Sequence, residues 1–181
     1  MIVFTGVAGS GKSSQGKRLA DYFGLPWVST GEFLRMLVSG NRRKEMVQGK
    51  LLEDKEIIGM VQKILTLINV NDEFVMDGFP RTQPQADWLL NQVKHGQLHV
   101  TAIVNMSADK ESVKNRLLKR GRPDDTEEAI IARFAEYDNY IVPILEEFQS
   151  YGVPVITINA NQSVDNVQKD VVSELKEVLQ V

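Results

Sequence analysis

The sequence predicts a three-layer α/β fold, in which a five-stranded parallel sheet is covered by helices on both faces. Short apolar segments alternate along the chain with longer segments of helical periodicity, which is typical of successive β–α–β units. The chain has 181 residues, 43% of them hydrophobic, which suits one domain with a substantial core. Because no repeat or low-complexity linker divides it, residues 1–181 are expected to form a single domain.

Five short apolar segments are expected to form the strands of the sheet. They are too short for stable helices, and the third leads directly into Asp77. In chain order, they are residues 2–5, 27–28, 74–76, 101–106 and 154–158.

Helices are expected between the strands. The first should end at Phe23, because Gly24 and Pro26 form a typical C-cap and breaker. A second should begin near Thr30, and the others are expected at residues 54–69, 83–95, 109–119, 126–149 and 164–179. Two of these have an apolar stripe at helical spacing: Ile57, Val61, Ile64 and Ile68 in one, and Val164, Val167, Val171, Leu175 and Val178 in the other.

The helix at 126–149 has two distinctive features. Asp125 and Glu128 resemble a capping box, in which an Asx side chain begins the helix. Pro143 lacks a backbone donor, so we expect a kink near Asn139.

Composition excludes several classes of protein. The net charge of −3 and the pI near 5.5 argue against general nucleic-acid binding, which requires a basic face. The first apolar run is too short for a signal peptide or a membrane span. The absence of cysteine excludes disulfides and thiolate metal sites. We therefore expect a cytoplasmic monomer without structural zinc.

Residues 6–13 (Gly-Val-Ala-Gly-Ser-Gly-Lys-Ser) fit the G-x-x-x-x-G-K-[ST] phosphate loop, between a predicted strand and a predicted helix. Glycines let successive N–H groups turn toward phosphate oxygens, and the following helix adds its positive end. Lys12 can then reach the β- and γ-phosphates, and the hydroxyl of Ser13 or Ser14 can approach magnesium. A dinucleotide G-x-G-x-x-G reading that starts at Gly9 fails, since Ser14 occupies its last position.

Asp77 ends a buried strand at the edge where α/β sheets bind ligands. Next to a phosphate loop, such a carboxylate is expected to hold magnesium, largely through water. A turn or helix-cap role is the alternative for this residue taken by itself.

Separated arginines suggest that a second phosphorylated molecule binds. Transfer between two nucleotides depends on positioning and charge stabilisation, and an anionic phosphate acceptor needs no general base. The candidate cations lie near glycines, prolines and strand ends: Arg35, Arg81, Arg116, Arg120, Arg122 and Arg133. By contrast, His95 and His99 are interpreted as surface residues.

Taken together, these motifs resemble the adenylate kinase family across nearly the whole chain. Besides the loop at residues 6–15, the matching segments are Ser-Thr-Gly-Glu-Phe-Leu-Arg at 29–35, Gly-Lys-Leu-Leu at 49–52, Asp-Gly-Phe-Pro-Arg-Thr-Gln-Pro-Gln at 77–85, Arg-Leu-Leu-Lys-Arg at 116–120 and Arg-Pro-Asp-Asp at 122–125. The resemblance implies a P-loop NTPase fold with an AMP-binding helical insertion at about 30–59 and a minimal lid at about 120–126.

The resemblance also implies a reaction and the residues that carry it out. MgATP and AMP would give two ADP, reversibly, with Mg²⁺ as the only metal. The residues implied to clamp the transferring phosphoryl group are Lys12, Arg81, Arg122 and Arg133. The ATP side would comprise Gly9, Ser10, Gly11, Lys12, Ser13, Ser14, Arg116, Arg120 and Gln162. The AMP side would comprise Thr30, Arg35, Leu52, Ile57, Gly78, Arg81, Gln85, Arg122 and Arg133, and the magnesium ligands would be Ser13 and Asp77. Asp124 and Asp125 would help to fix the arginines of the lid.

The sequence departs from the family pattern at three places. Ala8 replaces a usual proline, Ser13-Ser14 replaces a Gly-Thr pair, and only Gly121 separates Arg120 from Arg122. Two other functions stay open at this point. One is a monophosphate kinase of pyrimidine or broad specificity, and the other is a nucleotide-binding switch that transfers no phosphate.

Overall fold

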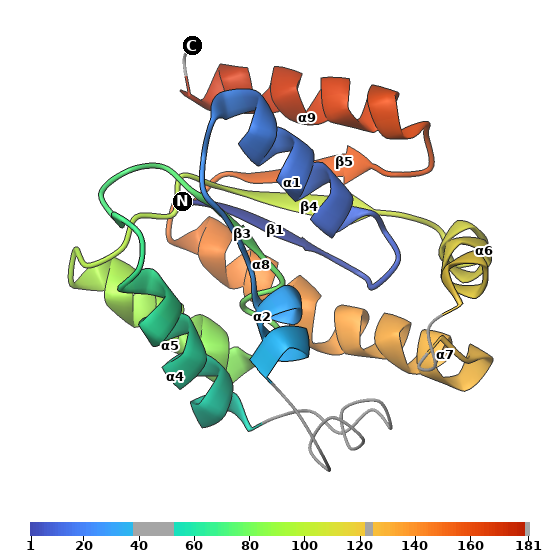
Figure 1. Ribbon diagram of the computed structural model, residues 1–181, viewed down its shortest axis with the longest axis horizontal. Coiled ribbons are helices and arrows are strands. Elements are labelled where there is room, and N and C mark those ends of the chain that lie inside the picture. Colours follow the sequence, from blue (N-terminus) through green and yellow to red (C-terminus); the bar gives the residue numbers. More distant parts are fainter. Residues whose placement is uncertain (38–52, 122–124, 180–181) are drawn as a thin grey trace.

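The computed structural model describes residues 1–37, 53–121 and 125–179. Within these ranges, five strands form one parallel sheet in the order β2-β3-β1-β4-β5 (Figure 1). The strands are β1 (Ile2–Gly6), β2 (Trp27–Ser29), β3 (Val75–Asp77), β4 (Ala102–Ser107) and β5 (Val155–Asn159). The three-layer α/β fold is thereby confirmed.

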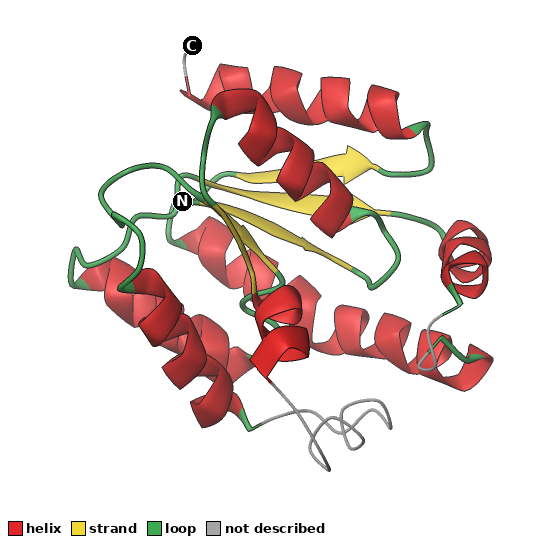
Figure 2. Cartoon of the chain, viewed as in Figure 1, coloured by secondary structure: helices red, strands yellow, loops and turns green. Residues whose placement is uncertain are grey.

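Helices fill the intervals between the strands, as Figure 2 shows. They are α1 (Lys12–Phe23), α2 (Thr30–Leu37), α4 (Asp54–Leu65), α5 (Gln83–Lys94), α6 (Lys110–Arg120), α7 (Glu127–Glu136), α8 (Val142–Ser150) and α9 (Val164–Leu179). A π-helix, η1 (Tyr137–Ile141), joins α7 to α8. Gly24 ends α1 in a left-handed conformation, and its N–H donates to the carbonyl of Ala20, as expected.

The two faces of the sheet have separate apolar cores, because side chains alternate along each strand. Ile2 and Phe4 of β1 belong to the core beneath α1 and α9, where Leu19 and Val171 are buried. Val3 belongs to the opposite core, which α4, α5 and α8 cover. Figure 1 shows these two helical layers on either side of the strands. A smaller cluster packs α6 and α7 against the loop after β1.

Where a kink was expected near Asn139, the chain forms a π turn. Pro143 has no N–H to donate to the Asn139 carbonyl. One residue earlier, the Val142 N–H bonds the carbonyl of Tyr137, five positions back. The missing donor is thus accommodated by a wider turn, and α8 continues from Val142.

The predicted capping box at Asp125 is wrong. Thr126 caps α7, and its side chain accepts from the Ala129 N–H at 3.2 Å. Asp125 bonds instead to Arg120 and Arg133, since two guanidinium groups attract a carboxylate more strongly than a backbone amide does.

One residue of each predicted apolar stripe does not belong to the buried face of its helix. Val164 is 51% exposed, and its carbonyl accepts from Gln15 Nε2 at 2.8 Å. Ile68 follows the end of α4 at Leu65 and is only partly buried. The other described members of both stripes pack in the cores. None of the helices in the described part of the chain is both long and apolar enough to cross a membrane.

Strands β1 and β4 approach very closely where the phosphate loop begins. Gly6 pairs with Met106 and has a φ of +135°, which L side chains rarely adopt. A Cβ at Gly6 would lie 2.6 Å from the Met106 carbonyl oxygen. Both the backbone conformation and the space therefore require glycine.

Gly6→Ala should destabilise the fold by roughly 2 kcal/mol more than Gly24→Ala, because overpacking adds to the cost of positive φ. Gly24 is the matched control: its φ is +68°, and nothing lies within 4 Å of a Cβ built there. Urea unfolding followed by circular dichroism measures both. Equal losses of stability would contradict the close approach at Gly6.

Candidate active site

The candidate site lies at the carboxyl edge of the sheet. Gly6, Ser29 and Asp77 end the neighbouring strands β1, β2 and β3 there. After β1 the chain crosses to β2 and β3 on one side of it, and then to β4 on the other. Parallel α/β sheets bind ligands at such a switch point, at the carboxyl ends of their strands.

The loop after β1 opens onto the N-terminus of α1. Gly9 and Gly11 have positive φ, and the N–H of Ser10 donates to the Val7 carbonyl at 3.0 Å. Gly11 is the N-cap of α1, so no side chain caps this end of the helix. The first turn of α1 contains no acidic residue. Its first N–H groups and the exposed Ser13 and Ser14 can therefore face an anion.

Lys12 stands where several charged side chains meet. Burial lowers the pKa of Lys12 to about 8, and repulsion from Arg81, Arg120 and Arg133 adds to this effect, while Asp77 opposes it. These four side chains come from the end of β3 (Asp77), the turn after it (Arg81), α6 (Arg120) and α7 (Arg133). The structure therefore brings these predicted residues together around Lys12. Added phosphate charge would stabilise the protonated amine.

Asp77 is buried, and its two oxygens have different surroundings. Oδ2 accepts from the Ser29 hydroxyl at 3.0 Å. Within the described residues, Oδ1 is buried without a hydrogen-bond partner. An oxygen left free at this edge suits a magnesium ion or its water, since Mg²⁺ takes one or two protein carboxylates together with substrate phosphates.

Arg120 and Arg133 share one carboxylate. Asp125, whose side chain is 1% exposed, accepts from Arg120 at 2.6 and 2.9 Å and from Arg133 at 3.0 Å. The pair comes from α6 and α7, so this contact joins the two helices. Arg122 and Asp124 lie outside the described residues, as does the middle of the predicted lid, residues 122–124.

Arg116 bridges the phosphate loop and the loop after β5. It donates to the carbonyl of Ala160 at 2.6 Å and to that of Ser10 at 3.4 Å. Gln162 lies two residues beyond Ala160, but its amide donates to Asp170 of α9 at 2.7 Å. A role for Gln162 toward ATP would therefore rest on its backbone or on a rearranged side chain.

On the other side of Asp77, the predicted acceptor residues lie close together. The Thr30 hydroxyl is buried and donates to the Gly78 carbonyl at 2.9 Å. Arg81 Nε donates to the same carbonyl at 2.8 Å. A Cβ at Gly78 would lie 2.7 Å from Arg81 Nη2, so this position accommodates only glycine without a shift of Arg81.

Gln85 is also buried here, but both ends of its amide already have protein partners. Its Oε1 accepts from the Arg81 N–H at 2.9 Å, and its Nε2 donates to Asp54 at 2.7 Å. Asp54 also accepts from the Thr82 hydroxyl at 2.6 Å.

The other acceptor-side predictions have mixed outcomes. Arg35 is exposed and forms an ion pair with Glu32, one helical turn away. Ile57 is buried in the core beneath α4, so only its backbone is suited to line a ligand. Leu52 lies outside the described residues.

Two residues that contact this site, Ser29 and Asp54, are not among the predicted site residues. Ser29 connects Asp77 to the start of α2, because its hydroxyl also accepts from the Glu32 N–H at 3.4 Å. Asp54 is the first residue of a helix, where a carboxylate is common for electrostatic reasons alone. Nothing in its local sequence indicates a contact 31 positions away.

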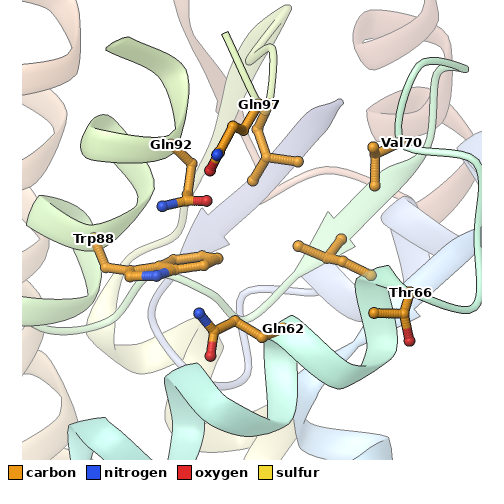
Figure 3. A pocket seen from close by; sticks show the side chains of 8 residues that line it. Gln62, Thr66, Val70, Trp88, Gln92 and Gln97 are labelled. Atoms are coloured by element: carbon orange, nitrogen blue, oxygen red, sulfur yellow. The ribbon is translucent and has the colours of Figure 1, made fainter. Parts of the chain in front are cut away.

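A cavity of about 220 Å³ lies at the other ends of α4 and α5 (Figure 3). Trp88 faces it from α5, surrounded by glutamine side chains. None of the predicted nucleotide-binding residues lines it, so it is separate from the candidate site. Its lining consists of Gln62, Leu65, Thr66, Val70, Trp88, Gln92, Gln97 and Leu98.

Comparisons with known proteins indicate the family of the chain. A family model described as adenylate kinase matches residues 4–153. The adenylate kinase of Corynebacterium urealyticum is 32% identical over 174 residues, which cover 93% of this chain and 94% of that protein. Adenylate kinase 1 of Synechocystis is 33% identical over 175 residues, which cover 92% of this chain and 91% of that protein. Adenylate kinase 1 of Nostoc is 33% identical over 184 residues, with 98% and 97% covered.

The lowered pKa of Lys12 predicts that polyphosphate binding takes up protons. Near pH 8.5 the free amine is mostly neutral, and bound phosphates raise its pKa, so binding should take up roughly half a proton or more. For the same reason, affinity should fall as the pH rises above about 8.

Calorimetry of MgATP binding in two buffers of different ionisation enthalpy measures this uptake. Lys12→Arg is the control, because it keeps the charge and does not titrate in this range. Equal uptake in both proteins would show that another group takes up the proton.

Proposed function

The chain belongs to the adenylate kinase family, and on this basis we propose that it transfers the terminal phosphate of MgATP to AMP, reversibly, to give two ADP. Family membership makes it a nucleoside monophosphate kinase. The observation that supports the finer assignment is the presence of two groups of phosphate-binding candidates, one on each side of Lys12 and Asp77.

The donor side, which binds ATP, is formed by the phosphate loop and α6. N–H groups of the loop and of the first turn of α1 bind the β- and γ-phosphates of ATP, together with Lys12. Arg116, already anchored to Ala160 and Ser10, packs over the ATP base, and Arg120 lies nearer the phosphates. Gln162 belongs to the same side.

The acceptor side, which binds AMP, is formed by the segment at about 30–59 and the turn after β3. Arg35 and Arg81 bind the phosphate of AMP, and each can exchange its present acceptor for a phosphate oxygen. Thr30 and Gln85 lie beside the adenine, close to the Gly78 backbone, and the backbone of Leu52 and Ile57 lines the rest.

Transfer itself requires positioning and charge stabilisation rather than a base. An anionic oxygen of the AMP phosphate attacks the γ-phosphorus of ATP, and the bond from that phosphorus to the β-bridging oxygen breaks, leaving two ADP. Lys12, Arg81, Arg122 and Arg133 stabilise the charge on the transferring group. Because the acceptor oxygen carries no proton, no side chain has to remove one.

Magnesium fits the residues present. Asp77 Oδ1 and the hydroxyl of Ser13 or Ser14 would hold it, largely through water, together with ATP oxygens. When bound, it neutralises charge on the β- and γ-phosphates. Ser29 keeps the other oxygen of Asp77 engaged, so Oδ1 would be the oxygen available to the ion or to its water.

Two other functions are distinguished from this one by particular residues. A pyrimidine-directed relative tends to have a smaller residue at the position of Thr30, which favours AMP here. A nucleotide-binding switch would need no second anionic subsite, so Arg35 and Arg81 argue against it.

The proposal is tested by supplying MgATP with AMP, CMP, UMP and GMP separately and following diphosphate formation. We expect AMP to be the best acceptor, and Lys12→Ala to reduce transfer to background. A higher kcat/KM with a pyrimidine monophosphate would replace the AMP assignment. Tight ATP binding without transfer to any acceptor would favour the switch.

Arg81→Ala should lower kcat/KM for AMP by about a thousandfold, on the scale of arginine-finger effects. Arg18→Ala is the matched control, since Arg18 forms an exposed ion pair with Asp165 and should leave turnover nearly unchanged. Steady-state kinetics with saturating MgATP measures both. Near-normal turnover of Arg81→Ala would remove this residue from the proposed clamp.

A further inference from the structure

The amide of Gln85 is held at both ends by groups that cannot exchange roles. The Arg81 backbone N–H can only donate, and it lies 2.9 Å from Oε1. The ionised Asp54 carboxylate can only accept, and its Oδ1 lies 2.7 Å from Nε2. Turning the amide over would place N–H against N–H and oxygen against oxygen, so its orientation is fixed by this pair of contacts.

Asp54 is itself held in place. The Thr82 hydroxyl donates to the same oxygen at 2.6 Å, which ties the start of α4 to the start of α5. The carboxylate does not serve as the helix cap, since Glu53 occupies the N-cap of α4. Gln85 is only 5% exposed, so an unsatisfied amide would be costly there.

The Gln85 amide, although bonded to Arg81 and Asp54, can still form hydrogen bonds with a base. Its nitrogen carries a second N–H, and its oxygen has a second lone pair. A glutamine amide can pair with adenine through the 6-amino donor and a neighbouring ring-nitrogen acceptor. A 6-oxo purine presents an acceptor where adenine presents the amino donor, and would need the amide turned over.

We propose that Asp54 is a positioning residue that sets the purine selectivity of this site. By holding Nε2, it keeps Oε1 of Gln85 toward the 6-amino group of the acceptor base and so disfavours 6-oxo purine monophosphates. This inference rests on the proposed function, in which Gln85 lies beside the adenine of AMP.

The test compares AMP with IMP, which differs from it only at the 6-position and the adjoining ring nitrogen. Asp54→Asn replaces the obligate acceptor with a group that can also donate, so both amide orientations become possible. We expect the AMP-to-IMP ratio of kcat/KM to fall about tenfold or more. The KM for AMP should rise, and the KM for IMP should stay unchanged or fall. The KM for MgATP and the kcat with saturating AMP should both stay unchanged.

Two further variants complete the design. Asp54→Ala removes the carboxylate without adding a donor and should reduce the ratio in the same direction. Glu53→Gln is the matched control, because it neutralises the neighbouring exposed carboxylate and should leave the ratio unchanged. A merely structural role for Asp54 would raise KM for both monophosphates together, and that outcome would overturn the proposal.

Gln85→Ala separates this proposal from the proposed function. If wild-type protein does not phosphorylate AMP, or if Gln85→Ala leaves KM for AMP unchanged, the proposed function or its base contact fails. A different outcome is that Gln85→Ala raises the KM for AMP while Asp54→Asn and Asp54→Ala leave the AMP-to-IMP ratio of kcat/KM at its wild-type value. In that case, only the positioning role of Asp54 is overturned.

Discussion

The concentration of positive charge around Lys12 is the constraint on which the rest of the site depends. Burial lowers the pKa of this amine to about 8, and repulsion from three arginines adds to the effect, in a chain whose net charge is −3. Such a cluster is unfavourable unless anions lie close to it. Asp77 supplies one negative charge from a strand end, and the first turn of α1 contains no acidic residue that would compete with a phosphate. The cluster therefore favours the binding of a highly charged ligand.

The arginines around this cluster have replaceable acceptors. Arg120 and Arg133 bind Asp125, Arg35 pairs with Glu32, and Arg81 donates to the Gly78 carbonyl. Each guanidinium is thus kept near the edge of the sheet in the free protein. Phosphate oxygens accept charge-assisted and often bidentate hydrogen bonds from guanidinium groups, so a nucleotide can take over these donors. This arrangement reduces the side-chain entropy that binding would otherwise cost.

Local patterns in the sequence predicted what depends on local physics. The strand runs, the Gly24 cap and the break caused by Pro143 follow from propensity and from missing donors, and all three are present. The phosphate loop and Asp77 could be placed at one edge because parallel strands share their carboxyl ends. The cap role predicted for Asp125 was wrong because its partners, Arg120 and Arg133, come from two helices, whereas the implied role of Asp125 in fixing arginines agrees with these contacts. The partners of Asp54 and Gln162 likewise depend on how the helices pack, which spacing alone does not show.

Arg81 connects the recognition of the base to the positioning of the phosphate. Its backbone N–H holds Gln85, while its side chain contacts Gly78, whose carbonyl also accepts from Thr30. A base that displaces the Gln85 amide therefore disturbs a hydrogen bond to the residue proposed to clamp the transferring group. Positioning errors of about 1 Å can cost on the order of a hundredfold in rate. In this arrangement, selection of the acceptor base acts on the transfer step as well as on binding, because both depend on the same short turn after β3.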